Sequence, residues 1–269
     1  LDTQSLDESR NNYIMCIVYI ADRYGVSVAD ITTGDYFVTE IEDSAKLMDE
    51  ICRFSPSEII CNEAFYMSGM DLEELKGRLG ITICSLDAWY FDDSVCRQKL
   101  LEHLKVSSFE GLGLADYDCG VISAGALLLY LIETQKNDLS NLTHISPYTS
   151  GRYMMIDSST RRNLELCETL REKQKRGSLL WVLDRTKTAM GARTLRKYVE
   201  QPLIDKREIE KRLDAVEEFQ SEAISREEIR EYLSPVYDIE RLIMKITYGS
   251  ANPRDLTAFC TSLEMLPPI

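Results

Sequence analysis

The first half of the chain begins with continuous runs of apolar residues. After these runs, segments with apolar residues at helical spacing alternate with short apolar runs. Three runs separated by polar turns predict an antiparallel meander, because tight turns join neighbouring antiparallel strands. Downstream, amphipathic segments alternate with short apolar runs, which is typical of helices between parallel strands. The predicted strands cover residues 13–20, 26–31, 36–41, 58–61 and 81–84, and the predicted helices cover residues 43–53, 70–79, 92–104 and 120–135.

In the second half, apolar residues recur only at helical spacing, and no strand is predicted there. A first helix is predicted from its N-cap Asp157 to Gly177, and the apolar run at residues 179–183 is predicted to be a short plug of the core. The remaining helices are predicted over residues 190–200, from Asp205, over residues 237–247, and from Asn252 and Pro253 to Leu266. The helix after Asp205 carries an apolar stripe that we expect to be buried, formed by Ile209, Leu213, Val216 and Phe219.

These patterns predict an α/β domain over residues 1–139, a polar linker over residues 140–156 and an all-α domain over residues 157–269. A three-strand meander followed by alternating helices and strands is the order of an RNase-H-like fold, with a mixed sheet and flanking helices. Residues 1–10 are polar and are expected to fray. The chain starts at Leu1 and stops after two prolines, so we interpret it as a fragment of a longer protein.

Charge divides unevenly along the chain, whose net charge is −14. Residues 1–150 hold ten basic and twenty-five acidic residues, and a domain of that balance repels phosphate and is a poor candidate for holding DNA. Between Arg161 and Lys197, by contrast, eleven basic residues face four acidic ones. We interpret that stretch as solvated helix faces or a surface for other helices, with direct phosphate contact as the alternative, since aromatic residues interleaved with the basic ones for base stacking are missing.

Few residues favour catalysis or a cofactor. The eight cysteines form no CxxC pair and only two histidines are present, so metal-ligand spacing is absent and a reduced, cytosolic environment is expected. The sequence contains no apolar run of membrane-spanning length, no P-loop and no GxSxG motif. A metal-dependent nuclease is the enzyme hypothesis for an RNase-H-like order, with Asp22, Asp30 and Asp35 as its carboxylates. Asp22 and Asp35 are predicted to lie in turns, which favours local turn bonding instead.

The basic stretch and its surroundings resemble the MutS family of mismatch-repair proteins. The longest matching motifs are DSSTRRNLEL at residues 157–166 and LLWVLDRTKTAMGARTLR at residues 179–196. Shorter ones are RLDAVEE at 212–218 and GSANPRDL at 249–256, and the first half adds DITTG at 30–34, WYF at 89–91 and IETQK at 132–136. We select as signature residues, with an expected interdomain role, Asp157, Arg161, Arg162, Asn163, Glu165, Trp181, Asp184, Arg185, Thr186, Gly191 and Arg193.

The resemblance implies a connector domain followed by part of the core, or lever, domain of a mismatch-recognition ATPase. It implies that the mismatch-reading, clamp and ATPase domains lie outside this chain, so ATP and Mg²⁺ are expected only for the full-length protein. It further implies that the connector docks MutL, and that mismatched duplex DNA binding and self-association belong to the full-length protein, in a bacterial cytoplasm at the nucleoid. The alternatives are the nuclease and an autonomous DNA-binding helical module.

Overall fold

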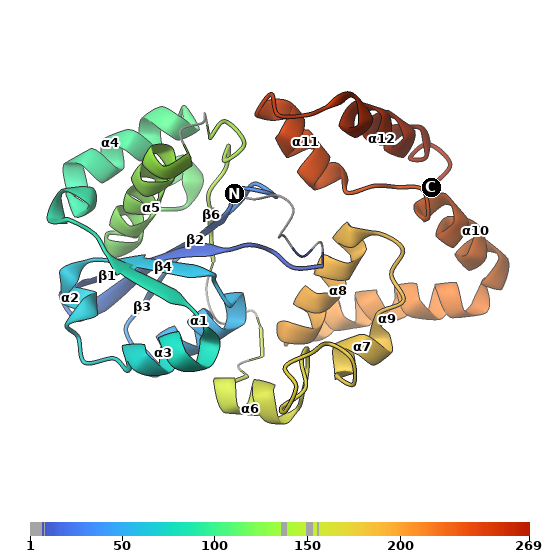
Figure 1. The fold of residues 1–269 in the computed structure, drawn as a ribbon, viewed down its shortest axis with the longest axis horizontal. Coiled ribbons are helices and arrows are strands. Elements are labelled where there is room, and N and C mark those ends of the chain that lie inside the picture. Colours follow the sequence, from blue (N-terminus) through green and yellow to red (C-terminus); the bar gives the residue numbers. More distant parts are fainter. Residues whose placement is uncertain (1–6, 8, 136–138, 149–152, 155) are drawn as a thin grey trace. The chain divides into compact units, whose positions relative to one another are not determined.

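A computed structural model describes residues 7, 9–135, 139–148, 153, 154 and 156–269 of this chain (Figure 1). They form two compact units. The α/β unit is Asn12–Thr149, and the helical unit combines Leu1–Asn11 with Ser150–Ile269. Within the described ranges, no helix is both long and apolar enough to cross a membrane.

The described part of the α/β unit contains one six-stranded mixed sheet in the order β5-β4-β1-β2-β3-β6. β1, β2 and β3 pair antiparallel, whereas β4 pairs parallel to β1, β5 parallel to β4, and β6 parallel to β3. The predicted meander is confirmed, although β2 begins earlier because Ala21 and Asp22, both at positive φ, close a tight turn. The strands are β1 Ile14–Ile20, β2 Arg23–Asp30, β3 Asp35–Ile41, β4 Glu58–Cys61, β5 Thr82–Ser85 and β6 Ser146–Pro147.

Helices cover both faces of this sheet (Figure 1). Alternate side chains of β1 enter different cores, since Cys16 packs with α4 and α5 while Ile17 packs with α1 and α3. A strand that is buried on both faces of a sheet has apolar residues at successive positions, which explains the continuous apolar run in the sequence of β1. The helices are α1 Ser44–Phe54, α2 Glu63–Tyr66, α3 Leu72–Leu79, α4 Asp93–Leu104 and α5 Cys119–Gln135, with short 3₁₀ turns η1 Ala88–Phe91 and η2 Glu110–Leu112.

The buried helix α5 packs unusually close to its neighbours through two glycines. A Cβ atom on Gly25 of β2 would lie 2.0 Å from the carbonyl oxygen of Cys119, and one on Gly125 would lie 2.4 Å from the Cβ of Cys96 in α4. A buried polar contact joins α5 to β2 as well, because the Ser27 and Ser123 hydroxyls are 2.9 Å apart. Close helix–sheet packing of this kind requires glycine, since any side chain would force the layers apart.

The linker prediction for residues 140–156 is wrong over its first part. Leu142 and Ile145 are fully buried, and β6 extends the sheet beside β3. Tyr148 then donates to Glu50 at 2.9 Å, and the guanidinium of Arg53 lies 4.9 Å from the Tyr148 ring centroid. The segment looked polar because its apolar residues are few and spaced irregularly. The predicted linker residues 149–152 and 155 lie outside the described ranges.

The N-terminal boundary of the α/β domain also needs correction, because residues 1–11 group with the helical unit. The expectation of a frayed end fails for its described residues. Arg10 forms an ion pair with Glu168, and Arg241 donates to the carbonyl oxygens of Asp7 and Arg10 at 3.2 and 2.7 Å. The other residues of the predicted frayed end, 1–6 and 8, lie outside the described ranges.

The helical unit confirms most predicted helices but not the first. α6 ends at Asn163 instead of near Gly177, because Glu165 adopts positive φ and its carbonyl accepts from Leu179 N at 3.0 Å. Its backbone is therefore committed to a nonlocal partner, and the helix cannot continue. The sequence did not predict α10. The helices are α6 Ser158–Asn163, α7 Leu179–Leu183, α8 Ala189–Glu200, α9 Lys206–Ser221, α10 Ala223–Leu233, α11 Ile239–Thr247 and α12 Pro253–Glu264.

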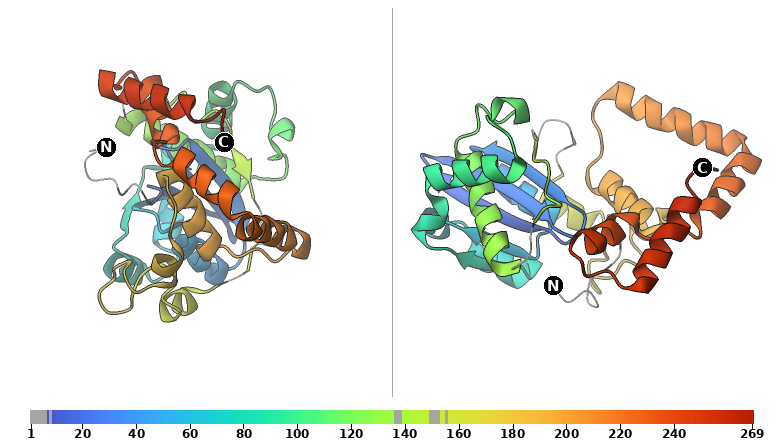
Figure 2. Two further views of the ribbon diagram at one scale, coloured as in Figure 1. Left: turned by 90° about the vertical axis from the view of Figure 1, so that its right-hand side faces the viewer. Right: turned by 90° about the horizontal axis from the view of Figure 1, so that it is seen from above.

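The apolar stripe of α9 is amphipathic as predicted but is not buried. Leu213 and Val216 are 60% and 63% exposed, and Ile209 and Phe219 are exposed as well. Figure 2 shows α9 and α10 as successive extended rods within this unit. No described segment of the unit covers the stripe, so the burial prediction is wrong for this chain even though the periodicity was real.

We predict that Gly125→Ala destabilises the α/β unit by about 1–3 kcal/mol, the usual cost of forcing volume into a packed interior. Gly77 in α3 is a matched helical control, since a Cβ there would meet nothing within 4 Å. Gly77→Ala should leave stability unchanged or raise it by up to about 1 kcal/mol. Thermal unfolding followed by circular dichroism tests both variants. Equal effects at the two sites would contradict the close-packing argument.

Candidate signature site in the helical unit

Arg161 joins the start of α6 to the end of α8. The Asp157 carboxylate caps α6 by accepting from the backbone and hydroxyl of Thr160 at 2.7 and 3.0 Å, and these bonds lower the pKa of Asp157. Arg161 then donates from Nε to Ile156 O at 3.1 Å and from Nη2 to Glu200 O at 2.7 Å. Because the last carbonyls of a helix lack intrahelical donors, a cation at Glu200 satisfies the C-terminal end of α8.

Asp184 organises the turn between α7 and α8. One carboxylate oxygen accepts from the backbone and hydroxyl of Thr186 at 3.1 and 2.7 Å, while the other pairs with Lys175 Nζ. Partial burial acts to raise the pKa of Asp184, but donation by Lys175 and Thr186 outweighs it and the pKa is lowered. Upstream, the buried Ser178 caps α7 by accepting from Trp181 N at 3.2 Å. Local polar bonds therefore fix the path of this stretch.

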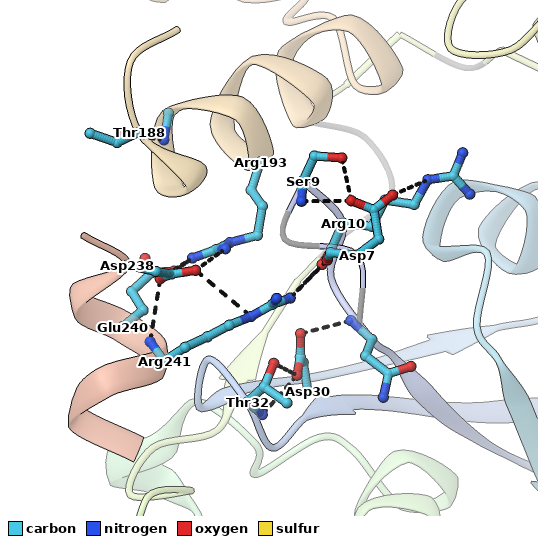
Figure 3. Close-up of polar contacts among 12 residues, drawn as sticks. Asp7, Ser9, Arg10, Asp30, Thr32, Thr188, Arg193, Asp238, Glu240 and Arg241 are labelled. Atoms are coloured by element: carbon cyan, nitrogen blue, oxygen red, sulfur yellow. Dashed lines mark hydrogen bonds and ion pairs between the residues drawn. The ribbon is translucent and has the colours of Figure 1, made fainter. Parts of the chain in front are cut away.

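The most buried polar contact among the signature residues is made by Arg193 (Figure 3). Its side chain is only 5% exposed and forms a bidentate pair with Asp238 at 2.6 and 2.8 Å, plus a bond to Glu240 at 2.5 Å. Burial acts to lower the pKa of Arg193, but the two carboxylates outweigh it and raise the pKa further above its ordinary value. This pairing ties α8 directly to the start of α11.

The same network continues to the N-terminal residues of the helical unit. Asp238 also caps α11 by accepting from Arg241 N at 3.3 Å, and Arg241 holds the carbonyls of Asp7 and Arg10 (Figure 3). Three segments far apart in sequence, α8, α11 and residues 7–10, thus share one chain of charged contacts. Loss of one member would leave the others buried without their counter-charges.

The structure does not gather all signature residues into one site. Arg162, Asn163 and Arg185 are exposed, and Trp181 is 44% exposed. Glu165 acts locally, with its carboxylate accepting from Leu170 N at 2.7 Å. Gly191 lies in the first turn of α8, where its N–H donates to the Thr188 cap at 3.0 Å. The interdomain role of the signature residues remains a prediction.

Sequence reasoning missed the partners that make the Arg193 network. Asp238 could have been found as an N-cap, because it precedes an apolar pattern at helical spacing. Its pairing with a residue 45 positions away has no local signal. Glu240 and Arg241 were missed for the same reason, because they contact Arg193 and the carbonyls of Asp7 and Arg10, which are far away in sequence.

Part of the basic stretch is used inside the helical unit. Arg161, Arg193 and Lys175 contact carbonyls or carboxylates as described above, and Arg196 pairs with Glu200 at 3.0 Å and lies 3.8 Å from Glu168. For these four residues, the contacts favour the interpretation that the basic stretch is a surface for other helices over the one in which it contacts phosphate. Arg162, Arg185 and several others in the stretch remain exposed.

The carboxylates of the nuclease hypothesis all accept hydrogen bonds within the α/β unit. Asp22 lies in a turn as predicted, whereas Asp35 begins β3, so its predicted turn position is wrong. Asp30 accepts from Asn12 N at 2.9 Å and from both the backbone and hydroxyl of Thr32 at 2.8 and 2.7 Å. Asp22 and Asp35 accept from tyrosine hydroxyls instead. Within the residues that the structure describes, no group of three His, Cys, Asp or Glu side chains is placed to hold a metal ion.

We predict that Arg193→Met lowers the free energy of unfolding of the helical unit by about 3–5 kcal/mol, the cost of breaking a buried pair by removing one partner. Arg193→Lys should fall between Met and the wild type, because lysine keeps the charge but not the bidentate geometry. Urea unfolding can be followed by Trp181 fluorescence in a Trp89→Phe background. The exposed Arg162 gives the control, and Arg162→Met should stay within about 0.5 kcal/mol. Equal losses at both arginines would refute the assignment.

Asp184 should contribute stability at neutral pH that is lost on acidification. Its pKa is lower in the folded than in the unfolded chain, so the contribution is present above the unfolded value near about 4 and disappears as pH falls through the lowered one. We expect Asp184→Asn to cost on the order of 1 kcal/mol at neutral pH, since the partly exposed Lys175 is screened. Urea titrations from about pH 7 to about pH 2 should show the difference from wild type shrinking to zero; a pH-independent difference would contradict this.

Comparison with known proteins places both units in one family. The MutS domain II model matches residues 12–146, and the MutS domain III model matches residues 159–269. The chain is 60% identical over 269 residues to the DNA mismatch repair protein MutS of Lachnoclostridium phytofermentans, covering all of this chain and 29% of that protein. The MutS proteins of Acetivibrio thermocellus and Ruminiclostridium cellulolyticum are 45% and 44% identical over 271 residues, again over the whole chain and 31% of each.

The chain therefore spans about 30% of the length of these curated relatives. Neither the nuclease nor the autonomous DNA-binding interpretation finds support in these matches. Together, the two domain models cover both structural units in the order that the sequence motifs indicated. The chain belongs to the MutS family and contains its domains II and III.

Proposed function

We propose that this chain is the module of a mismatch-repair ATPase that relays between recognition of mismatched DNA and nucleotide state. The α/β unit would be the connector and the helical unit part of the core, or lever, and neither would carry an active site. The family match and the names of the relatives, which are DNA mismatch repair proteins, support the assignment. For the connector we propose an RNase-H-like fold, a label supported by its strand order.

The observation that carries the relay role is the Arg193 network. A relay must transmit a displacement, and a bidentate pair fixes both distance and orientation between the helices that it joins. If α8 moves, Asp238 and therefore the start of α11 must follow or lose a buried counter-charge. The network thus favours two discrete arrangements over gradual deformation. No covalent bond is made or broken in such a mechanism.

The proposed partners divide according to charge. Over residues 12–149 nine basic residues stand against twenty-two acidic ones, which suits docking of a protein such as MutL better than contact with phosphate. Binding of mismatched DNA and self-association are proposed for the whole protein. We place that protein in the bacterial cytoplasm, associated with the nucleoid when it is on DNA.

ATP and Mg²⁺ are proposed as ligands of the whole protein only. The sequence has no GxxxxGK[ST] loop, so the residues of this chain do not fit a nucleotide phosphate site. No step of the proposed relay is therefore assigned to a nucleotide bound here.

The test uses the full-length protein with Arg193→Lys, measured for mismatch affinity without nucleotide and for ATP-driven release of the mismatched duplex. We expect affinity to change by less than about twofold, while the effect of ATP on release weakens at least about fivefold, the lower end of ordinary coupling free energies. Arg162→Lys is the control and should behave as wild type. Undiminished coupling in a folded Arg193→Lys protein would reject the relay role of this network.

A further inference from the structure

A groove opens at one edge of the sheet in the α/β unit, where the parallel strands β4 and β5 end. Its volume is about 520 Å³, and its lining comes from two segments, 62–67 directly after β4 and 85–91, which begins with the last residue of β5. Within these segments Phe65, Trp89 and Tyr90 are not part of the lining. Crevices outside the carboxyl ends of parallel strands are the common ligand sites of α/β sheets. None of the selected signature residues lines this groove, and the WYF motif at residues 89–91 contributes only Phe91 to it, so the groove is still without an assigned role.

The floor of the groove is held in place by Asn62. Its side-chain oxygen accepts from Tyr19 N and Phe65 N, both at 3.1 Å, and its amide donates to Tyr19 O at 3.1 Å. The second wall is tied to the first, because Leu86 N donates to Cys61 O at 2.9 Å. The groove is thus preformed, which lowers the cost of binding.

Large apolar side chains stand open to solvent in and beside the groove. Met67 is 74% exposed and Tyr66 is 39% exposed in the first segment. In the second segment, Trp89 does not line the groove but directly follows the lining residue Ala88; it is 48% exposed and stacks on Tyr90 with ring centroids 3.9 Å apart. Tryptophan, tyrosine and methionine are the residue types enriched in protein interfaces, where a few such anchors supply most of the binding energy.

The charge of the lining selects among partners. Glu63 and Asp87 line the two walls, and neither carboxylate forms an ion pair with a described residue. Lys76 is the cation near the rim, but it lies over the Tyr66 ring at 5.6 Å and pairs with Glu73. The groove therefore offers two unneutralised carboxylates in a unit that is itself strongly acidic, which disfavours nucleic acid and acidic protein segments.

We propose that this groove docks a segment of a partner protein that carries a large apolar side chain flanked by lysine or arginine. The apolar side chain packs against Met67, Tyr66 and Phe91, and the flanking cations pair with Glu63 and Asp87. The inference deepens the partner-docking role proposed above for the connector and rests on it. It adds where the partner sits and what chemistry it presents.

The first experiment titrates the whole chain with three short synthetic peptides. One alternates lysine with leucine and phenylalanine, the second replaces its lysines by glutamate, and the third replaces its apolar residues by serine. We expect the first to bind at least about tenfold more tightly than either of the others, with amide shifts in NMR spectra confined to Asn62–Met67 and Ser85–Phe91. Equal binding of all three, or tighter binding of the acidic peptide, would overturn the proposal.

A charge-reversed variant makes the test specific. Glu63→Lys combined with Asp87→Lys changes only wall residues at the groove surface and should invert the preference toward the acidic peptide. Met67→Glu should weaken binding of the basic apolar peptide by at least about tenfold. Leu79 is the matched control, because it is 43% exposed but ends α3 before β5 begins, near the opposite end of that strand from the groove. Leu79→Glu should bind as wild type, and loss of binding there would reject the location.

A final measurement separates this inference from the docking role on which it rests. MutL binding by the full-length protein is compared between wild type and the charge-reversed variant. Loss of MutL binding in the variant supports both the groove inference and the proposed docking role of the connector. If MutL binding is unchanged while the peptide preference still inverts, the groove stands and MutL docking through it is rejected. If the peptide preference does not invert, the groove inference fails whatever MutL does.

Discussion

The buried pairing of Arg193 with Asp238 is the constraint on which the helical unit depends. Removing a guanidinium from water is costly unless its donors are matched, and here two carboxylates match them with the geometry of a fork. Because Asp238 is also the N-cap of α11, one carboxylate both begins a helix and fixes it to α8. Such a pair fixes the orientation of the two helices more than it adds net stability, because the cost of desolvation offsets much of the attraction.

The two units are stabilised by different kinds of interaction. The α/β unit buries aliphatic side chains on both faces of its sheet, and α5 approaches β2 and α4 so closely that only glycine fits. The helical unit buries few apolar residues among those described, and its segments are connected by caps, carbonyl contacts and ion pairs. A tightly packed unit resists deformation, whereas a unit held by polar contacts can exchange one set of partners for another. That contrast suits a rigid docking body joined to an adjustable lever.

Most helices and strands could be predicted because caps, turns and apolar spacing lie within the element itself. The others depend on contacts between residues far apart in sequence, which no local pattern indicates. Asn252 and Pro253 predicted the start of α12 correctly, and Asp255 completes a capping box there that was not predicted. β6 has only two residues and exists because β3 is beside it, which no periodicity reveals. α6 stops where the backbone of Glu165 pairs with Leu179, and Arg193 finds Asp238 across 45 residues. Apolar spacing on α9 predicted amphipathicity correctly but could not say whether a covering segment is present.

Charge links these structural differences to a division of roles. In the helical unit, several bases of the Arg161–Lys197 stretch are neutralised by neighbours, so its near-balanced charge is partly internal. In the α/β unit, acidic residues outnumber basic ones and Glu63 and Asp87 remain unpaired with any described cation. A charged side chain that pairs with a group in its own unit stabilises that unit. A charged side chain without such a partner, beside a preformed apolar groove, can instead determine which partner binds. This difference supports the proposed division, in which the α/β unit is bound by another protein and the helical unit transmits a change of orientation.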